Sequence, residues 1–184
     1  DMQYAFLDPE GPAYLPAGVA IVPRIRRLAE AFRRAKRPVF YTRHAEDPRG
    51  GNAGMMGKWW GKPSPREGSW ESTIVEELAP RPDDVVIPKI RYSAFVATDL
   101  ELRLREARVE DIVITGVMTN LCCETTARDA FMRDFRVFVC ADATAAPTLE
   151  MHEASLLNLA YGFAVVTTAG AVAAALRAPK RTPR

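Results

Sequence analysis

Cysteine is scarce in this sequence: three residues in 184, at positions 122, 123 and 140. Their odd number and the lack of metal-type spacing argue against a disulfide framework. An excess of one charge is also missing, because 25 lysines and arginines face 23 aspartates and glutamates, a net charge of +2 that gives no electrostatic footprint for nucleic acid. No apolar run approaches the roughly 18 residues that span a membrane, and no stretch resembles a secretion signal. We therefore expect a cytoplasmic protein without a nucleic-acid or membrane partner.

The chain is long enough to bury a sizeable core, and we expect one domain over residues 1–184 with a loose tail at 178–184. Short β-branched runs alternate with helical patterns, and Thr98 and Glu101 form a capping-box pattern at one helix start. This alternation predicts a three-layer, doubly wound α/β fold with a mostly parallel sheet covered by helices on both faces. The expected strands are 38–42, 84–88, 111–115, 136–140 and 163–167, and the expected helices lie near 18–36, 71–79, 98–107, 120–133, 149–160 and 169–177.

Two regions do not fit this alternation. Residues 43–70 are rich in glycine, proline and tryptophan and are too long for a plain connection, so we expect a pocket wall or a subunit contact there. The sequence also opens with DMQYAF, without a strand before it. A doubly wound sheet needs its first strand at this point, so we expect an apolar segment ahead of Asp1.

Reactive side chains follow the expected strands. Ligands bind outside the carboxyl ends of the strands in parallel α/β sheets. Lys89 comes directly after DVVIP, and a cysteine pair comes a few residues after DIVIT. Asp1 joins them if a strand precedes it. A carboxylate, an ammonium and a thiol at one edge can carry out acyl transfer, although each residue taken singly also fits a plain structural role.

The two adjacent cysteines differ in their expected environment. If Thr119 is the N-cap, Cys122 lies in the first helical turn, where backbone N–H groups have no intrahelical partner and a thiolate is favoured. Cys123 lies about 100° further around the helix and is expected to pack against the sheet as a small hydrophobic residue. Geometry thus favours Cys122 as the nucleophile, with inert packing of either cysteine as the alternative.

Four separated segments resemble the isochorismatase-like cysteine hydrolase superfamily, in that family's order and over essentially the whole chain. The segment TGVMTNLCCETTARDAF resembles the signature around the family's nucleophile. The opening Asp-Met-Gln, the segment IPKIRYSAF at 87–95 and the segment from His152 to Phe163 resemble further family motifs.

The resemblance implies a catalytic triad of Asp1, Lys89 and Cys122, with Cys123 where the family usually has valine. It also implies a cis peptide bond between Val117 and Met118. The oxyanion hole would then consist of the backbone N–H groups of Met118 and Cys122. No cofactor is implied.

The sequence departs from one branch of the family. Nicotinamidases carry an Asp-x-His motif after the second strand and a further histidine, which bind a metal, whereas this chain has His44 at the aspartate position and only one other histidine. A metal site of that type, and nicotinamidase activity with it, is therefore not expected. The patterns G-S-W at 68–70 and K-x-R-Y-S at 89–93 are similar to those of ureido and carbamoyl-amide hydrolases.

We therefore predict a cysteine-dependent hydrolase that cleaves the C–N bond of a small amide, carbamoyl or ureido substrate through a thioester. The alternatives are an isochorismatase-type ether or ester hydrolase in which Cys122 is a bystander, and a non-catalytic interaction module of the same fold. Relatives are commonly dimers or tetramers, so we expect a homodimer or homotetramer. The expected substrate-binding residues, each of which also fits core or dimer packing, are Phe6, Tyr14, His44, Trp59, Trp60 and Tyr92.

Overall fold

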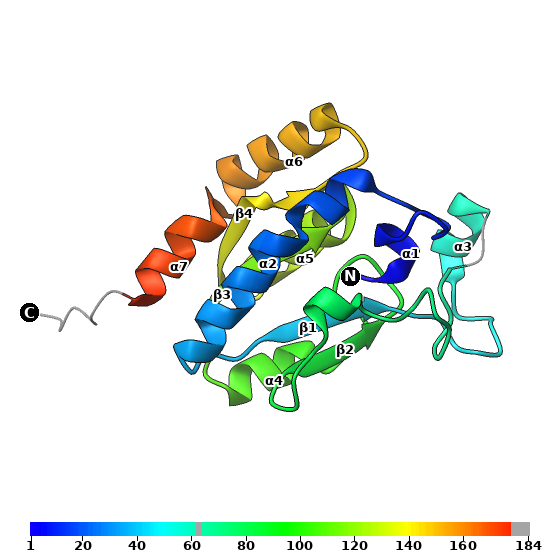
Figure 1. Ribbon diagram of the computed structural model, residues 1–184, viewed down its shortest axis with the longest axis horizontal. Helices are drawn as coiled ribbons and strands as arrows, with labels where there is room; N and C mark the ends of the chain where they lie inside the picture. The colour runs from blue at the N-terminus through cyan, green and yellow to red at the C-terminus, as the bar shows by residue number, and fades with distance from the viewer. Residues whose placement is uncertain (62–63, 178–184) are drawn as a thin grey trace, which may run out of the picture.

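Five parallel strands and the helices around them form the computed structural model, which describes residues 1–61 and 64–177. The predicted tail at 178–184 lies outside these residues. The first two strands pair with each other, and the last three form a second parallel sheet in sequence order. The predicted α/β class is therefore confirmed, with two hydrogen-bonded sheets in place of one (Figure 1). The strands are β1 (Phe40–His44), β2 (Val85–Lys89), β3 (Asp111–Val117), β4 (Arg136–Ala145) and β5 (Val165–Thr167).

Helices cover both faces of the sheets. The long helix α2 packs against β3, β4 and α7 on one face, while α5 and α6 contact each other on the other face, where α5 packs on β4 and α6 on β5 (Figure 1). Helix α4 joins α5 in the core of that second face. These helices are α2 (Pro16–Arg34), α4 (Leu100–Glu106), α5 (Glu124–Phe131), α6 (Leu149–Gly162) and α7 (Ala169–Arg177).

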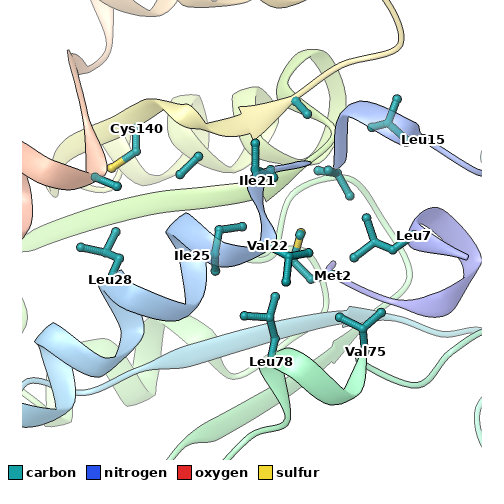
Figure 2. Packing of buried hydrophobic residues seen from close by; sticks show 14 of the residues in the cluster. Met2, Leu7, Leu15, Ile21, Val22, Ile25, Leu28, Val75, Leu78 and Cys140 are labelled. Carbon is teal, nitrogen blue, oxygen red and sulfur yellow. The ribbon is translucent and has the colours of Figure 1, made fainter. Parts of the chain in front are cut away.

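The two cores follow from the periodicities of the sequence. Successive side chains of a strand point to opposite faces, and in β4 Val137 and Val139 enter one core whereas Cys140 enters the other. On α2, Ile21 and Ile25 lie on one helix face and are buried (Figure 2). Each such side chain contributes about 1.5–3 kcal/mol through burial, so the covered sheet is a stable platform for the strand ends.

One predicted helix is wrong. Of the segment 71–79, only Glu76–Leu78 (η1) is helical, and it is a 3-10 turn. The carbonyls of Glu71 and Thr73 accept hydrogen bonds from Ala5 and Tyr4 instead. These bonds bind the segment to the short helix α1 (Tyr4–Leu7), so the same carbonyls are not available for a regular helix here.

Two further differences from the prediction are the start of one helix and the presence of a helix that was not expected. The helix that was expected to begin with a capping box at Thr98 begins at Leu100 with Asp99 as its N-cap. The Thr98 hydroxyl donates to the Ala94 carbonyl and accepts from the Leu100 N–H, so it is engaged one residue before the cap. The predicted 43–70 loop contains a helix, α3 (Gly54–Trp60), which has no buried residue.

Residues 1–3 lie between the two sheets. The Gln3 side chain is fully buried, and it donates to the His44 carbonyl at 2.8 Å and accepts from the His44 N–H at 2.8 Å. Gly116 in β3 has a φ of 112°, and a Cβ atom on it would lie 3.6 Å from the Met2 sulfur. These contacts fix Asp1 between the ends of β1 and β3. That an apolar segment precedes Asp1 stays a prediction.

Within residues 1–61 and 64–177, no helix is long and apolar enough to cross a membrane.

Candidate active site

The candidate site lies at the carboxyl ends of β1 and β2. These strands pair in parallel with His44 opposite Lys89, and each of these residues ends its strand. Both side chains are buried, Lys89 to 2 % exposure. A buried lysine at a strand end needs a partner, because an unpaired buried charge is strongly destabilising.

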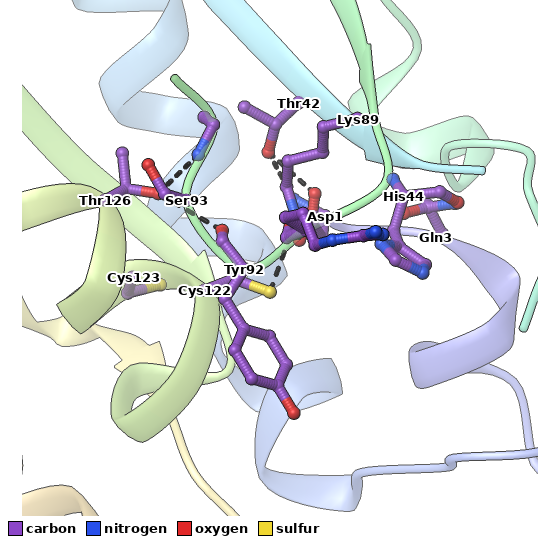
Figure 3. Close-up of polar contacts among 12 residues, drawn as sticks. Asp1, Gln3, Thr42, His44, Lys89, Tyr92, Ser93, Cys122, Cys123 and Thr126 are labelled. Atoms are coloured by element: carbon purple, nitrogen blue, oxygen red, sulfur yellow. Dashed lines mark hydrogen bonds and ion pairs between the residues drawn. The ribbon is translucent and has the colours of Figure 1, made fainter. Parts of the chain in front are cut away.

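That partner is Asp1. The Lys89 Nζ lies 2.6 Å from Asp1 Oδ2, and both side chains are 1 % exposed. The other carboxylate oxygen, Oδ1, accepts a hydrogen bond of 2.7 Å from the Thr42 hydroxyl. The carboxylate is thus held from two sides by neighbouring strands (Figure 3).

Lys89 also reaches the first of the two adjacent cysteines. Its Nζ lies 3.4 Å from the Cys122 sulfur and donates to the Arg91 carbonyl at 3.0 Å. One ammonium therefore contacts the carboxylate and the thiol together, as Figure 3 shows. A neighbouring ammonium favours the thiolate, which is the nucleophilic form of cysteine.

The turn that carries Cys122 differs from the prediction. Residues Thr119–Cys123 form a π-helical turn capped by Met118, so Thr119 is not the N-cap of an α-helix. The N–H groups of Leu121 and Cys123 both donate to the Met118 carbonyl, which widens this turn before α5 begins. π turns of this kind are frequent at functional sites. The peptide bond between Val117 and Met118 is cis, at the position that the resemblance implied.

The two cysteines have different surroundings. Cys122 is partly exposed, whereas Cys123 is 4 % exposed and packs in the core with Ala127. Burial raises the pKa of the Cys123 thiol to about 12, so at neutral pH it is protonated. The structure thus gives Cys123 the packing role expected from the sequence and leaves Cys122 beside Lys89.

Thr119 links the cysteine turn to α6. Its side chain is fully buried, and its hydroxyl lies 2.9 Å from His152 Nδ1. The second histidine of the chain thus contacts the residue that starts the π turn. The sequence offered no signal for this contact, because 33 residues separate the two side chains.

His44, expected to bind substrate, lies beside Lys89 and Asp1 with its backbone held by Gln3 (Figure 3). Burial, followed by the charge of Lys89, lowers its pKa to about 4, so the imidazole is neutral at neutral pH. Its Nδ1 atom is buried without a hydrogen-bond partner in the described part of the chain.

The expected aromatic residues are spread over several elements. Trp60 on α3 donates from its indole N–H to the Tyr92 hydroxyl at 2.8 Å, which brings these two together three residues after Lys89. Trp59 is 78 % exposed, and Tyr14 is 40 % exposed. Phe6 packs against the core around α2.

Two residues of the site were not found from the sequence. Thr42 bonds Asp1 through its hydroxyl, and Arg91 bonds Lys89 through its backbone carbonyl. Thr42 lies two residues before His44 on the same face of β1, so strand periodicity could have indicated it. A backbone carbonyl leaves no such signal.

Among the described residues, no group of three or more His, Cys, Asp or Glu side chains could hold a metal ion.

The parallel α/β fold, which carries a buried carboxylate, an ammonium and a cysteine at its strand ends, matches solved structures of isochorismatase-like hydrolases. The family model of the isochorismatase domain matches residues 1–171, and the chain belongs to this family.

Its relatives include named amidohydrolases. Nicotinamidase 3 of Arabidopsis thaliana is 44 % identical over 148 residues, covering 78 % of this chain and 73 % of the relative. Ureidoacrylate amidohydrolase RutB of Methylobacterium radiotolerans is 34 % identical, and the similarity extends over 100 % of this chain and 80 % of the relative. The crystal structure of a cysteine hydrolase from Pseudomonas syringae pv. phaseolicola matches with a TM-score of 0.92 at 34 % identity, over 96 % of this chain and 89 % of that one.

Proposed function

We propose that this protein hydrolyses the C–N bond of a small amide, carbamoyl or ureido compound with Cys122 as its nucleophile. One observation carries the proposal: the Lys89 ammonium contacts the buried Asp1 carboxylate at 2.6 Å and the Cys122 sulfur at 3.4 Å. Carboxylate, ammonium and thiol are the groups that activate a nucleophile and move a proton to a leaving amine.

In the first half-reaction, Asp1 takes the Cys122 proton and the thiolate attacks the substrate carbonyl carbon. Lys89 keeps the Asp1 carboxylate ionised and stabilises the thiolate by its charge. The backbone N–H groups of Met118 and Cys122 hold the oxyanion, and each such donor is typically worth about 3 kcal/mol in the transition state. Asp1 returns its proton to the nitrogen, and ammonia or an amine leaves as the C–N bond breaks.

In the second half-reaction, water attacks the thioester, or the S-carbamoyl group in the case of a ureide. Asp1 takes a proton from the water and returns it to the Cys122 sulfur as the C–S bond breaks, so the carboxylate and the thiol return to their starting states. No step requires a cofactor. Thr42 supports both halves, because its bond to Oδ1 keeps the carboxylate in one orientation.

Two relatives support this substrate class by their names, a nicotinamidase and a ureidoacrylate amidohydrolase. The similarity to the first keeps nicotinamide among the substrates to be tested, although His44 stands where nicotinamidases have a metal-binding aspartate. We assign substrate contacts to His44, Trp59, Trp60 and Tyr92 near Lys89, and to Phe6 and Tyr14 from the first sixteen residues. A cytoplasmic location and a homo-oligomer stay predictions of the sequence.

The test is ammonia release from a panel of nicotinamide, carbamoyl amino acids, biuret-like ureides and maleamate. The wild-type protein is compared with Cys122→Ala and with Cys123→Ala as the matched control. We expect release from at least one compound, its loss by more than about a thousandfold in Cys122→Ala, and its retention in Cys123→Ala. The control removes a buried thiol that is protonated at neutral pH.

Release that survives Cys122→Ala would contradict the assignment of Cys122 as the nucleophile. A wild-type protein that hydrolyses none of the compounds would favour the non-catalytic alternative.

A further inference from the structure

Arg91 contacts both the candidate catalytic lysine and the helix α3. Its backbone carbonyl accepts the hydrogen bond from Lys89 Nζ at 3.0 Å. A lysine ammonium carries three donors, and among the described residues its polar partners are Asp1, Cys122 and this carbonyl. The carbonyl is the one contact that takes no part in the chemistry, so its position helps set where the ammonium lies between carboxylate and thiol.

The side chain of Arg91 fixes this part of the backbone. Its Nη1 donates to the carbonyls of Ile90 at 2.7 Å, Asn52 at 3.0 Å and Ala53 at 3.3 Å. No carboxylate lies within ion-pair distance of it in the described residues. Its partners in these residues are backbone carbonyls, two of which directly precede α3.

Within residues 1–61 and 64–177, few other contacts hold helix α3. None of its residues is buried, and glycines with positive φ flank it, with φ values of 93° at Gly51 and 59° at Gly61. Its other anchor is the hydrogen bond from Trp60 to the Tyr92 hydroxyl at 2.8 Å. In the described part of the chain, the side chains that bond to this region are thus those of the adjacent residues Arg91 and Tyr92, two and three positions after Lys89.

On its other side, the segment after Lys89 is fixed to α5. Thr126 donates to the Tyr92 carbonyl at 3.4 Å and accepts from the Ala94 N–H at 3.1 Å (Figure 3). Ser93 donates to Asp129 at 2.5 Å. Tyr92, Ser93 and Ala94 are therefore held independently of α3. Arg91 precedes these three residues in the chain, and the bonds of its own guanidinium fix its position.

We propose that Arg91 is a positioning residue whose bonds to the carbonyls before α3 place the Lys89 ammonium beside Cys122. It contacts neither the reacting atoms nor the thiol and acts through Lys89. The effect on turnover rests on the proposed function, whereas the effect on the thiol does not.

The first test measures the reactivity of Cys122 without any substrate. Iodoacetamide alkylation at neutral pH, followed by mass of the labelled peptide, reports on this thiol because Cys123 and Cys140 are buried. Lys89→Met sets the lower limit of the rate. We expect Arg91→Met to slow alkylation about three- to tenfold, since a displaced ammonium favours the thiolate less.

Two further variants make the comparison specific. Arg91→Lys is expected to recover most of the rate, because all three side-chain bonds of Arg91 come from one nitrogen and an ammonium carries three donors on one nitrogen. Trp60→Phe releases α3 at its other anchor and is expected to alkylate at the wild-type rate. In turnover, Arg91→Met should lower kcat about tenfold or more, whereas Trp60→Phe should raise KM.

An alkylation rate in Arg91→Met equal to wild type would overturn the inference, and so would an equal slowing in Trp60→Phe. If Arg91→Met does not fold, Arg91→Gln, which keeps one donor group, takes its place with the same expected order of rates. Slowed alkylation in a protein that hydrolyses no amide would support the positioning role and contradict the proposed function, so the two failures are distinguishable.

Discussion

The cluster of Asp1, Thr42, Lys89 and Cys122 and the neighbouring helix α3 are held in place by different means. In the cluster, strands β1 and β2 fix the side chains, and Asp1 and Lys89 are each 1 % exposed. Helix α3 buries no residue and is bound through Arg91 and through the bond from Trp60 to Tyr92. The candidate catalytic side chains are thus held by paired strand ends, whereas α3 rests on a few polar contacts within the described residues. Substitutions in the cluster should therefore affect folding and turnover together, and substitutions on α3 should affect turnover alone.

The largest effect is expected from Lys89→Met. This change leaves the Asp1 carboxylate buried without its ion-pair partner, which typically costs about 3–5 kcal/mol of unfolding free energy. It also removes the charge that favours the thiolate, so kcat/KM should fall by about a hundredfold or more. Urea unfolding and steady-state kinetics measure the two effects.

Lys58→Met is the control from the other region, because Lys58 is an exposed residue on α3. Its unfolding free energy should change by less than about 0.5 kcal/mol. The double variant Asp1→Asn with Lys89→Met should recover much of the stability without recovering activity. If both single lysine variants lost equal stability, the contrast between the two regions would be wrong.

An intermediate effect is expected from pH through His44. Its folded-state pKa of about 4 lies below the ordinary value of 6.5, so between these values the unfolded chain binds more protons than the folded one. Stability should therefore fall as pH drops from about 6.5 toward 4, by at most about 3 kcal/mol for this residue. Below pH 4 the contribution of His44 to the unfolding free energy is fully lost.

The measurement is the difference in unfolding free energy between wild type and His44→Leu at pH 7 and at pH 4.5. The carboxylates titrate in both proteins and cancel in this difference. Wild type should lose more stability than the variant over this interval. Parallel losses would show that His44 is not buried in its neutral form.

The sequence predicted the fold well, because its periodicities are local. Runs of β-branched residues marked all five strands, although β1 lies two residues later than expected. Its register is set by pairing, with Phe40 opposite Val85 and His44 opposite Lys89, and no local pattern carries that information. The prediction of a helix at 71–79 was wrong for the same reason, because carbonyls of this segment accept hydrogen bonds from α1.

The site was predictable in part. Lys89 and Cys122 follow from the rule that ligands bind at strand ends, whereas the pairing of Asp1 with Lys89 was implied by the family resemblance. Thr42 and Arg91 were missed because their roles depend on contacts between distant segments and on a backbone carbonyl. The helix α3 was missed because its glycines and exposed aromatics give no apolar face.

The smallest effect is expected at Trp60. Trp60→Phe removes the hydrogen bond to Tyr92, which is worth about 0.5–1.5 kcal/mol, so KM should rise about two- to tenfold with kcat unchanged. Unfolding free energy should change by less than about 1 kcal/mol, because the side chain is 52 % exposed. Trp70→Phe is the matched control: Trp70 is 46 % exposed and stacks on Tyr4. An equal rise of KM in the control would mean that α3 has no special part in substrate binding. A rise confined to Trp60→Phe would assign a share of the substrate affinity to α3, apart from the cluster at the strand ends.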